Sequence, residues 1–122
     1  MPRPFKEELD AARLKHVLFK SKLRSYLYGS GIDDAPIRDP RVCALGQWIE
    51  QIGRPQFRHL PEMQQLDELH EEMHREANRL LDLYGAGRRD EAVAGLSGVN
   101  RLADMLTDLL DTLEAKLRTE GR

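Results

Sequence analysis

Three long stretches of this 122-residue chain place mostly apolar side chains at alternating intervals of three and four residues. That spacing keeps the side chains on one face of an α-helix, and it is typical of helices that pack along one another in a bundle. The stripes consist of Phe5, Leu9, Ala12, His16, Phe19, Leu23 and Tyr26; of Met63, Leu66, His70, Met73, Ala77, Leu80 and Tyr84; and of Ala92, Leu96, Val99, Ala103, Leu106, Leu110, Leu113 and Leu117.

A shorter apolar pattern lies between the first two stripes and predicts one more helix. Because no segment alternates with a period of two, the sequence predicts an all-α fold, an antiparallel bundle of about four main helices in one domain over residues 1–122. Glycine, proline and capping residues place the helix ends. The first helix is expected to end at Tyr28-Gly29-Ser30-Gly31, the second to run from Asp39 (N-cap) and Pro40 to Gly53, the third from Pro61 to Gly85, and the fourth from Asp90 (N-cap) to about Arg118.

Two glycines, Gly95 and Gly98, fall inside the predicted fourth helix. A helical glycine costs on the order of 1 kcal/mol relative to alanine. Either the first turn of that helix is weak, or a second helix approaches closely at these positions.

The composition excludes several classes of protein. Nineteen Lys and Arg against 21 Asp and Glu give a net charge of −2, without the basic excess that is typical of nucleic-acid binding. No apolar run approaches the ~20 residues that span a bilayer, and the N-terminus has no signal-peptide core. The single cysteine excludes an internal disulfide framework. We therefore expect a cytoplasmic protein without nucleic-acid or membrane partners.

Two histidines, His70 and His74, are four residues apart on the third predicted helix. That spacing puts both imidazoles on one face, one turn apart, so that both can reach one metal ion. His16 and His70 also interrupt otherwise apolar stripes. A buried imidazole loses stability unless it finds a polar partner, and two of them in adjacent helices suggest one shared partner.

Cys43 is the fourth candidate, near the start of the second predicted helix, where a helix N-terminus favours the thiolate over the thiol. One thiolate and three imidazoles complete a four-coordinate zinc site, whose net positive charge calls for a nearby carboxylate such as Asp67 or Glu71. On a straight helix Cys43 would lie opposite the apolar arc. Either both faces of that helix are covered, or the helix begins only after Cys43.

The segment Cys43-Ala44-Leu45-Gly46-Gln47-Trp48 resembles the Cys-x-Leu/Phe-Gly-x-Trp signature of the chemoreceptor zinc-binding domain family. His16 stands upstream of it, and His70-Glu71-Glu72-Met73-His74 is similar to the family's His-x-x-x-His. The resemblance implies that zinc is bound by His16, Cys43, His70 and His74. It also implies a homodimeric helical bundle, joined in other proteins to bacterial chemoreceptors or diguanylate cyclases, whose output zinc and in some cases oxidants control.

Other functions remain open from the residues alone. His70-Glu71-x-x-His74 formally satisfies the zinc hydrolase motif, but a metal-bound Cys43 would close the position that a catalytic water needs. A hemerythrin-like di-iron site needs more histidines than this chain has, and His59 beside Pro61 is expected to lie outside the site. A metal-free helical dimerisation module is the remaining alternative.

Two expectations concern surfaces and redox chemistry. Apolar residues beyond the stripes, Val17 and Leu18 on the first helix and Leu102, Met105 and Leu109 on the fourth, predict a homodimer. A zinc-bound Cys43 would be a thiolate, the form of cysteine that oxidants attack. We therefore expect the site to respond to oxidants as well as to zinc, as the family resemblance implies for some members.

Overall fold

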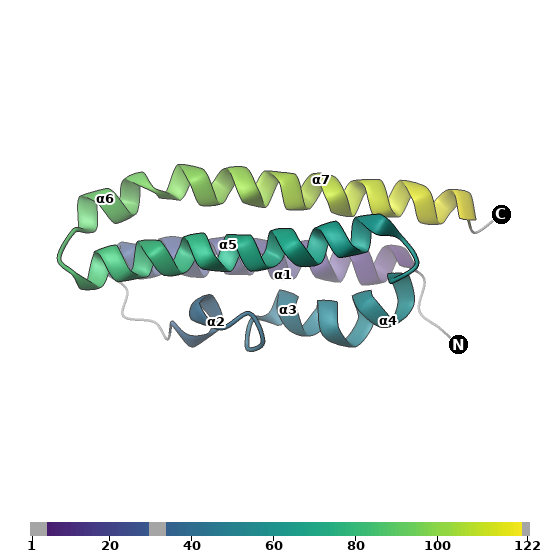
Figure 1. Cartoon of the computed structure of the whole chain (residues 1–122), viewed down its shortest axis with the longest axis horizontal. Helices are drawn as coiled ribbons and strands as arrows, with labels where there is room; N and C mark the ends of the chain where they lie inside the picture. Colours follow the sequence, from purple (N-terminus) through teal and green to yellow (C-terminus); the bar gives the residue numbers. More distant parts are fainter. Residues whose placement is uncertain (1–4, 30–33, 121–122) are drawn as a thin grey trace.

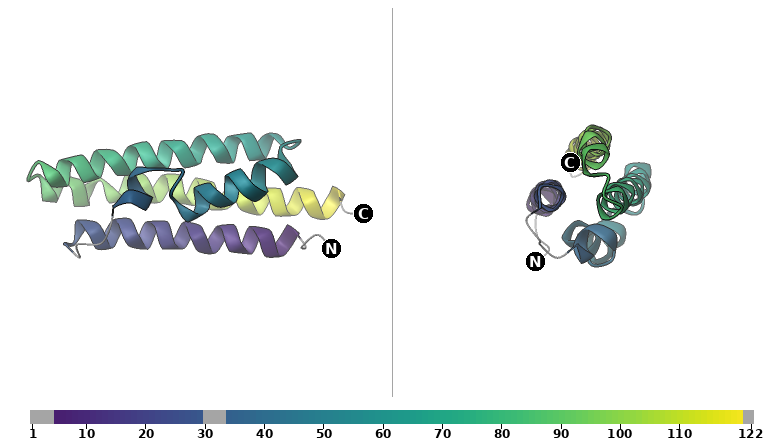
Figure 2. Two further views of the ribbon diagram at one scale, coloured as in Figure 1. Left: turned by 90° about the horizontal axis from the view of Figure 1, so that it is seen from below. Right: turned by 90° about the vertical axis from the view of Figure 1, so that its left-hand side faces the viewer.

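The computed structural model describes residues 5–29 and 34–120. It is a bundle of four helical segments, each antiparallel to the next along the chain, which we call layers. They are α1 (Phe5–Leu27), a broken helical segment, α5 (Pro61–Gly85), and α6 (Arg89–Ala94) continued by α7 (Leu96–Glu120). Seen end-on, these four layers surround a common core (Figure 2). The predicted all-α bundle is therefore confirmed (Figure 1).

The long helices end close to the predicted positions. α1 ends at Leu27, before Gly29 with φ +87°, while Ser30 and Gly31 lie outside the described residues. Pro61 opens α5, and Gly87 with φ +81° follows its last turn. These positive φ angles favour glycine, because other residues meet a steric penalty there. Within the described part of the chain, no helix is long and apolar enough to cross a membrane.

The second predicted helix is displaced toward the C-terminus. Its expected N-cap, Asp39, instead closes a turn: its side chain accepts a hydrogen bond from the Arg41 backbone N–H at 2.9 Å, and its carbonyl accepts from Val42 and Cys43. The helix starts only at Ala44, as α3 (Ala44–Trp48), after a separate short helix, α2 (Ala35–Arg38). An Asp side chain can cap a turn as readily as a helix, so the prediction at this position was wrong.

The predicted stop at Gly53 was also wrong. Helical structure continues through a π-helical turn, η1 (Ile49–Gly53), into α4 (Arg54–Phe57). Pro55 has no N–H, and its ring would collide with a carbonyl one turn earlier in a regular α-helix. In the wider π-turn the Arg54 N–H bonds the Ile49 carbonyl, and this turn leads the chain to Pro55 without a regular α-helical turn before it.

The fourth predicted helix is divided at Gly95 into α6 and α7, and its N-cap is Arg88 rather than Asp90, which lies in the first turn. A Cβ at Gly95 would lie 2.2 Å from Leu80 Cδ2, whereas one at Gly98 would meet only Glu76 Oε1 at 3.8 Å. Gly95 thus marks a close approach of this layer to α5, which is one of the two explanations that the sequence allowed.

Candidate metal centre

The helix α5 supplies two of the predicted ligands. His70 and His74 lie one turn apart on its core face, and both are buried, with 2% and 1% of their surface exposed. The ring of Phe19 on α1 packs against His74 with centroids 4.7 Å apart. The apolar stripe of α5 therefore turns both imidazoles inward, where water does not solvate them.

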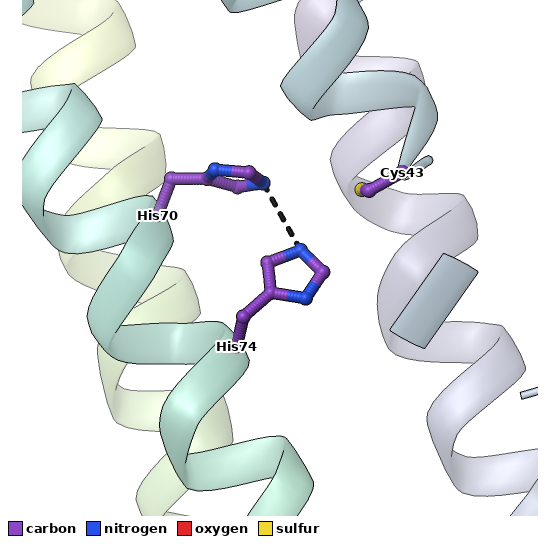
Figure 3. Close-up of side chains that lie close together, drawn as sticks. All are labelled: Cys43, His70 and His74. Atoms are coloured by element: carbon purple, nitrogen blue, oxygen red, sulfur yellow. Dashed lines mark hydrogen bonds between the residues drawn. The ribbon is translucent and has the colours of Figure 1, made fainter. Parts of the chain in front are cut away.

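Cys43 approaches the same point from the neighbouring segment, which runs from α2 to α4 beside α5 (Figure 2). It occupies the N-cap position of α3 with extended backbone angles, φ −61° and ψ 135°, so the helix begins only after it. This resolves the alternative that the sequence left open, because an extended residue can aim its side chain across the core. The ligand atoms of Cys43, His70 and His74 lie within 4.8 Å of one another (Figure 3). Two nitrogens and a sulfur are a donor set that zinc prefers.

Hydrogen bonds fix the protonation pattern of the two rings. His74 Nδ1 lies 2.6 Å from the carbonyl oxygen of Ile37, so Nδ1 must carry the hydrogen and donate it. His74 Nε2 then has a free lone pair, which accepts a hydrogen bond from His70 Nε2–H at 3.1 Å. The Ile37 carbonyl thus leaves His74 Nε2 in the form that binds a metal ion, as outer hydrogen bonds do in known metal sites.

Burial suits both imidazoles to metal binding. It lowers the pKa of His70 to about 3, with a further contribution from the nearby His74, and it also lowers the pKa of His74. Neutral imidazole is the ligand form, so both rings remain competent below neutral pH.

For Cys43 the expectation of a favoured thiolate was wrong in the metal-free protein. Burial raises the pKa of the thiol, and this outweighs the opposing effect of the Gly46 and Leu45 backbone N–H groups. α3 has only five residues, so its N-terminus supplies little stabilisation of negative charge.

His16 is not part of the three-residue cluster in this structure. It lies on the core face of α1 with 3% of its surface exposed, and neither ring nitrogen has a hydrogen-bond partner among the described residues. Burial and the nearby Lys20 lower its pKa, and its charge would in turn lower the pKa of His70. The Ala103 carbonyl on α7 lies near enough to act against this lowering of the His16 pKa, but it makes no hydrogen bond of normal geometry to the ring. A buried polar group without a well-formed hydrogen bond costs about 1–3 kcal/mol, so His16 has a nitrogen that a metal ion could use.

A pocket of about 250 Å³ opens beside His70, and it is lined by Asp67 and Glu71, the two carboxylates expected near the metal ligands. Asp67 pairs with Arg54 through two hydrogen bonds of 2.6 and 2.8 Å, and its negative charge acts to raise the pKa of His70. Glu71 is exposed at the same pocket. A side chain at Gly46 would collide with the Pro40 carbonyl, 1.8 Å from an ideal Cβ, and would crowd His70 Cε1 at 3.1 Å. The absence of a side chain at Gly46 therefore leaves room for the Pro40 carbonyl and for the His70 ring.

The sequence analysis did not predict the hydrogen bonds that orient His74 and the α2 segment beside it. A backbone carbonyl, such as that of Ile37, leaves no pattern in a sequence. Asn78, however, follows His74 by four residues on the same helix face, and its side chain donates to the Arg38 carbonyl at 3.0 Å. A polar residue that extends the His70–His74 stripe is the signal that could have revealed it. His59 is exposed and lies outside the cluster, as expected.

The pKa of His70 predicts how the metal-free protein responds to acid. The folded pKa of about 3 lies below the ordinary value of 6.5, so the unfolded chain binds the proton first. The stability linked to neutral His70 is then fully present above pH 6.5, and it is lost as the pH drops from 6.5 toward 3, by about 1.4 kcal/mol per pH unit. Urea unfolding of the metal-free protein at pH 7.5, 6 and 5 should show this loss, and His70→Leu should reduce its slope while His59→Leu should not. Equal slopes in all three proteins would contradict the assignment.

Comparison with models of protein families places this chain in a family. The profile of the chemoreceptor zinc-binding domain (CZB) matches residues 16–81, which is more than half of the chain and includes Cys43, His70 and His74. Searches of curated proteins and of solved structures find no match. Zinc is accordingly the metal implied for the cluster, whose nitrogen and sulfur donors fit it. The chain belongs to the chemoreceptor zinc-binding domain family.

Proposed function

We propose that this chain is a regulatory zinc-sensing domain, formed by residues 1–122 as one unit, in which His16, Cys43, His70 and His74 together bind one zinc ion. The observation that carries the proposal is the buried cluster of Cys43, His70 and His74, with ligand atoms within 4.8 Å of one another. One ring nitrogen of His16 would supply the fourth donor from α1, since neither nitrogen has a hydrogen-bond partner among the described residues. Four donors match the coordination number of a structural zinc site.

The sensing mechanism is a change in helix order. Zinc bound to these four residues would connect three layers of the bundle: α1 through His16, the N-cap of α3 through Cys43, and α5 through His70 and His74. Without the metal, the packed face of α1 keeps the two His16 nitrogens, which no described residue hydrogen-bonds. Because metal binding is coupled to folding in such sites, zinc occupancy would set how firmly α1 packs on the rest of the bundle.

The hydrolase alternative has less support from the geometry. A catalytic zinc keeps an open position for water, and a general base must reach that water. Here the Cys43 sulfur lies among the ligand atoms, and Glu71 is exposed on α5 at the rim of the pocket beside His70. We therefore propose a sensor without enzymatic activity of its own. Its place is the cytoplasm, and its target is a separate signalling domain or protein.

Replacing His16 tests the fourth ligand. His16→Leu removes two buried unpaired nitrogens, so the metal-free protein should become more stable, by about 1–3 kcal/mol, while zinc binding weakens. Elemental analysis of the wild-type protein should give one zinc per chain, and the variant should lose the thermal stabilisation that zinc confers. His59→Leu is the control, because His59 is exposed. A His16→Leu protein that binds zinc as tightly as the wild type would exclude His16 as a ligand.

The homodimer expected from the sequence remains a proposal, and the structure favours α1 as its interface. Leu14, Val17 and Leu18 are 62%, 57% and 46% exposed and lie together on the side of α1 away from the core. On α7, Met105 is 49% exposed, while Leu102 and Leu109 are half-buried against the core. The α1 face is the larger exposed apolar surface of the two, and it lies on the same turns as His16.

Charge substitutions distinguish the two faces. Val17→Glu should convert a dimer into a particle of 14.0 kDa, because a carboxylate cannot be buried in an apolar interface without a partner. Met105→Glu should leave the dimer intact. Light scattering at micromolar concentration measures both, with circular dichroism as a check of folding. A wild-type protein that is already monomeric would refute the dimer, and dissociation by Met105→Glu alone would move the interface to α7.

We also propose that the zinc-bound Cys43 responds to oxidants. A groove of about 30 Å³ lies between α1 and the segment from α2 to α3, and Cys43, Lys15 and Lys22 are among the residues that line it. The two lysines would attract an anionic oxidant such as hypochlorite to the neighbourhood of Cys43. The thiolate would be oxidised to sulfenic acid while hypochlorite is reduced to chloride. Sulfenic acid is a poorer ligand, so zinc would be held less tightly.

Mass spectrometry can follow this reaction with an internal reference. Zinc-loaded protein treated with limiting hypochlorite should gain oxygen at Cys43 before it does so at Met105, the exposed methionine on α7. A chromophoric chelator should report zinc release on the same timescale. If Met105 is oxidised while Cys43 stays reduced, the site senses zinc alone.

A further inference from the structure

The short helix α2 carries the carbonyl that orients His74, yet it is only one turn long. Its backbone turn closes on Asp34, whose carbonyl accepts from the Ile37 and Arg38 N–H groups at 2.9 Å. A helix of four residues has no independent stability, because nucleation costs more than one turn of hydrogen bonds returns. Something outside α2 must therefore hold it in place over His74.

Apart from the His74 hydrogen bond, three features hold α2 in place. The Ile37 side chain is fully buried, which fixes the depth of the segment but not its rotation. Asn78 supplies the directional contact: its amide Nδ2 donates to the Arg38 carbonyl at 3.0 Å, one residue beyond the carbonyl that His74 uses. The ion pair of Arg38 with Asp82 is more exposed and contributes less, as surface pairs generally do.

The state of the Asn78 amide supports a specific role. Only Nδ2 can donate to a carbonyl, so the orientation of the amide is determined, and its Oδ1 is buried without a hydrogen-bond partner in the part of the chain that the structure describes. An apolar residue would avoid that cost at this half-buried position. Among the described residues, the hydrogen bond to the Arg38 carbonyl is the polar contact that accounts for an amide side chain at position 78.

We propose that Asn78 is a positioning residue of the metal centre, which holds α2 so that the Ile37 carbonyl keeps His74 in the tautomer that binds zinc through Nε2. The inference rests on the proposed zinc-sensing function. The same segment continues through the Asp39 turn to Cys43, whose N–H bonds the Asp39 carbonyl at 3.2 Å. By holding this segment, Asn78 acts on two ligands. It acts on His74 through the Ile37 carbonyl and on Cys43 through the backbone that follows Arg38.

Two variants remove the donor in different ways. Asn78→Leu has similar volume and no polar group, and Asn78→Asp has the same shape but presents an acceptor to the carbonyl. Asn100→Leu on the exposed face of α7 is the matched control. Nitrogen-15 NMR of the metal-free protein reads the His74 tautomer, and a chelator competition reads zinc affinity.

We expect the wild-type protein and Asn100→Leu to show the Nδ1–H tautomer at His74. Both Asn78 variants should populate the Nε2–H tautomer and bind zinc about tenfold more weakly. That is the lower end of the effect of substituting residues that orient metal ligands without touching the metal. A merely structural role would weaken the fold without changing the tautomer. If circular dichroism shows that Asn78→Leu is unfolded, Asn78→Asp decides the question.

The outcomes separate this inference from the proposed function. Unchanged His74 tautomers in the Asn78 variants would overturn the positioning role, whatever the zinc affinity. A wild-type protein that binds no zinc would overturn the sensor, while the tautomer measurement, which needs no metal, would still decide the role of Asn78.

Discussion

The burial of imidazole side chains in the packed faces of two helices is the constraint on which the rest of this structure depends. His16, His70 and His74 together expose almost none of their surface, and burial lowers the pKa of each. A small bundle has few contacts with which to offset such groups. The rings at His70 and His74 find each other and the Ile37 carbonyl, whereas His16 finds no partner among the described residues. The core is therefore arranged for a metal ion more than for maximum stability of the bundle alone.

The broken helical segment from α2 to α4 follows from the same constraint. A straight helix from residue 40 to 52 would point Cys43 away from the core. The chain instead interrupts helical structure between α2 and α3, and the extended Cys43 turns its sulfur toward His70 and His74. The Asp39 turn and the absence of a side chain at Gly46 make this interruption possible. The irregular backbone in this segment positions the Cys43 sulfur, while α1, α5 and α6–α7 supply most of the buried apolar side chains.

Periodic features of the sequence were predictable, and local backbone geometry was not. The three apolar stripes identify α1, α5 and the α6–α7 layer because each buried face repeats with the period of a helix. The His70–His74 pair follows from the same periodicity, and the family signature brings in Cys43. The Asp39 and Asp90 caps and the stop at Gly53 were misplaced, because an Asp or Gly favours several local structures and tertiary packing selects among them. The distance between His16 and the cluster depends on helix packing, which no single-sequence pattern encodes.

The contact between His74 and a main-chain oxygen has a consequence for how this sequence can vary. An exchange of Ile37 for another apolar residue leaves the acceptor where it is, so substitution at this position is compatible with the site. Insertion or deletion of one residue between Ile37 and Cys43 is different, because it would shift the carbonyl relative to the sulfur. In this segment the length of the chain is constrained more strongly than the identity of its side chains, and relatives of this protein should differ here by replacement rather than by gaps.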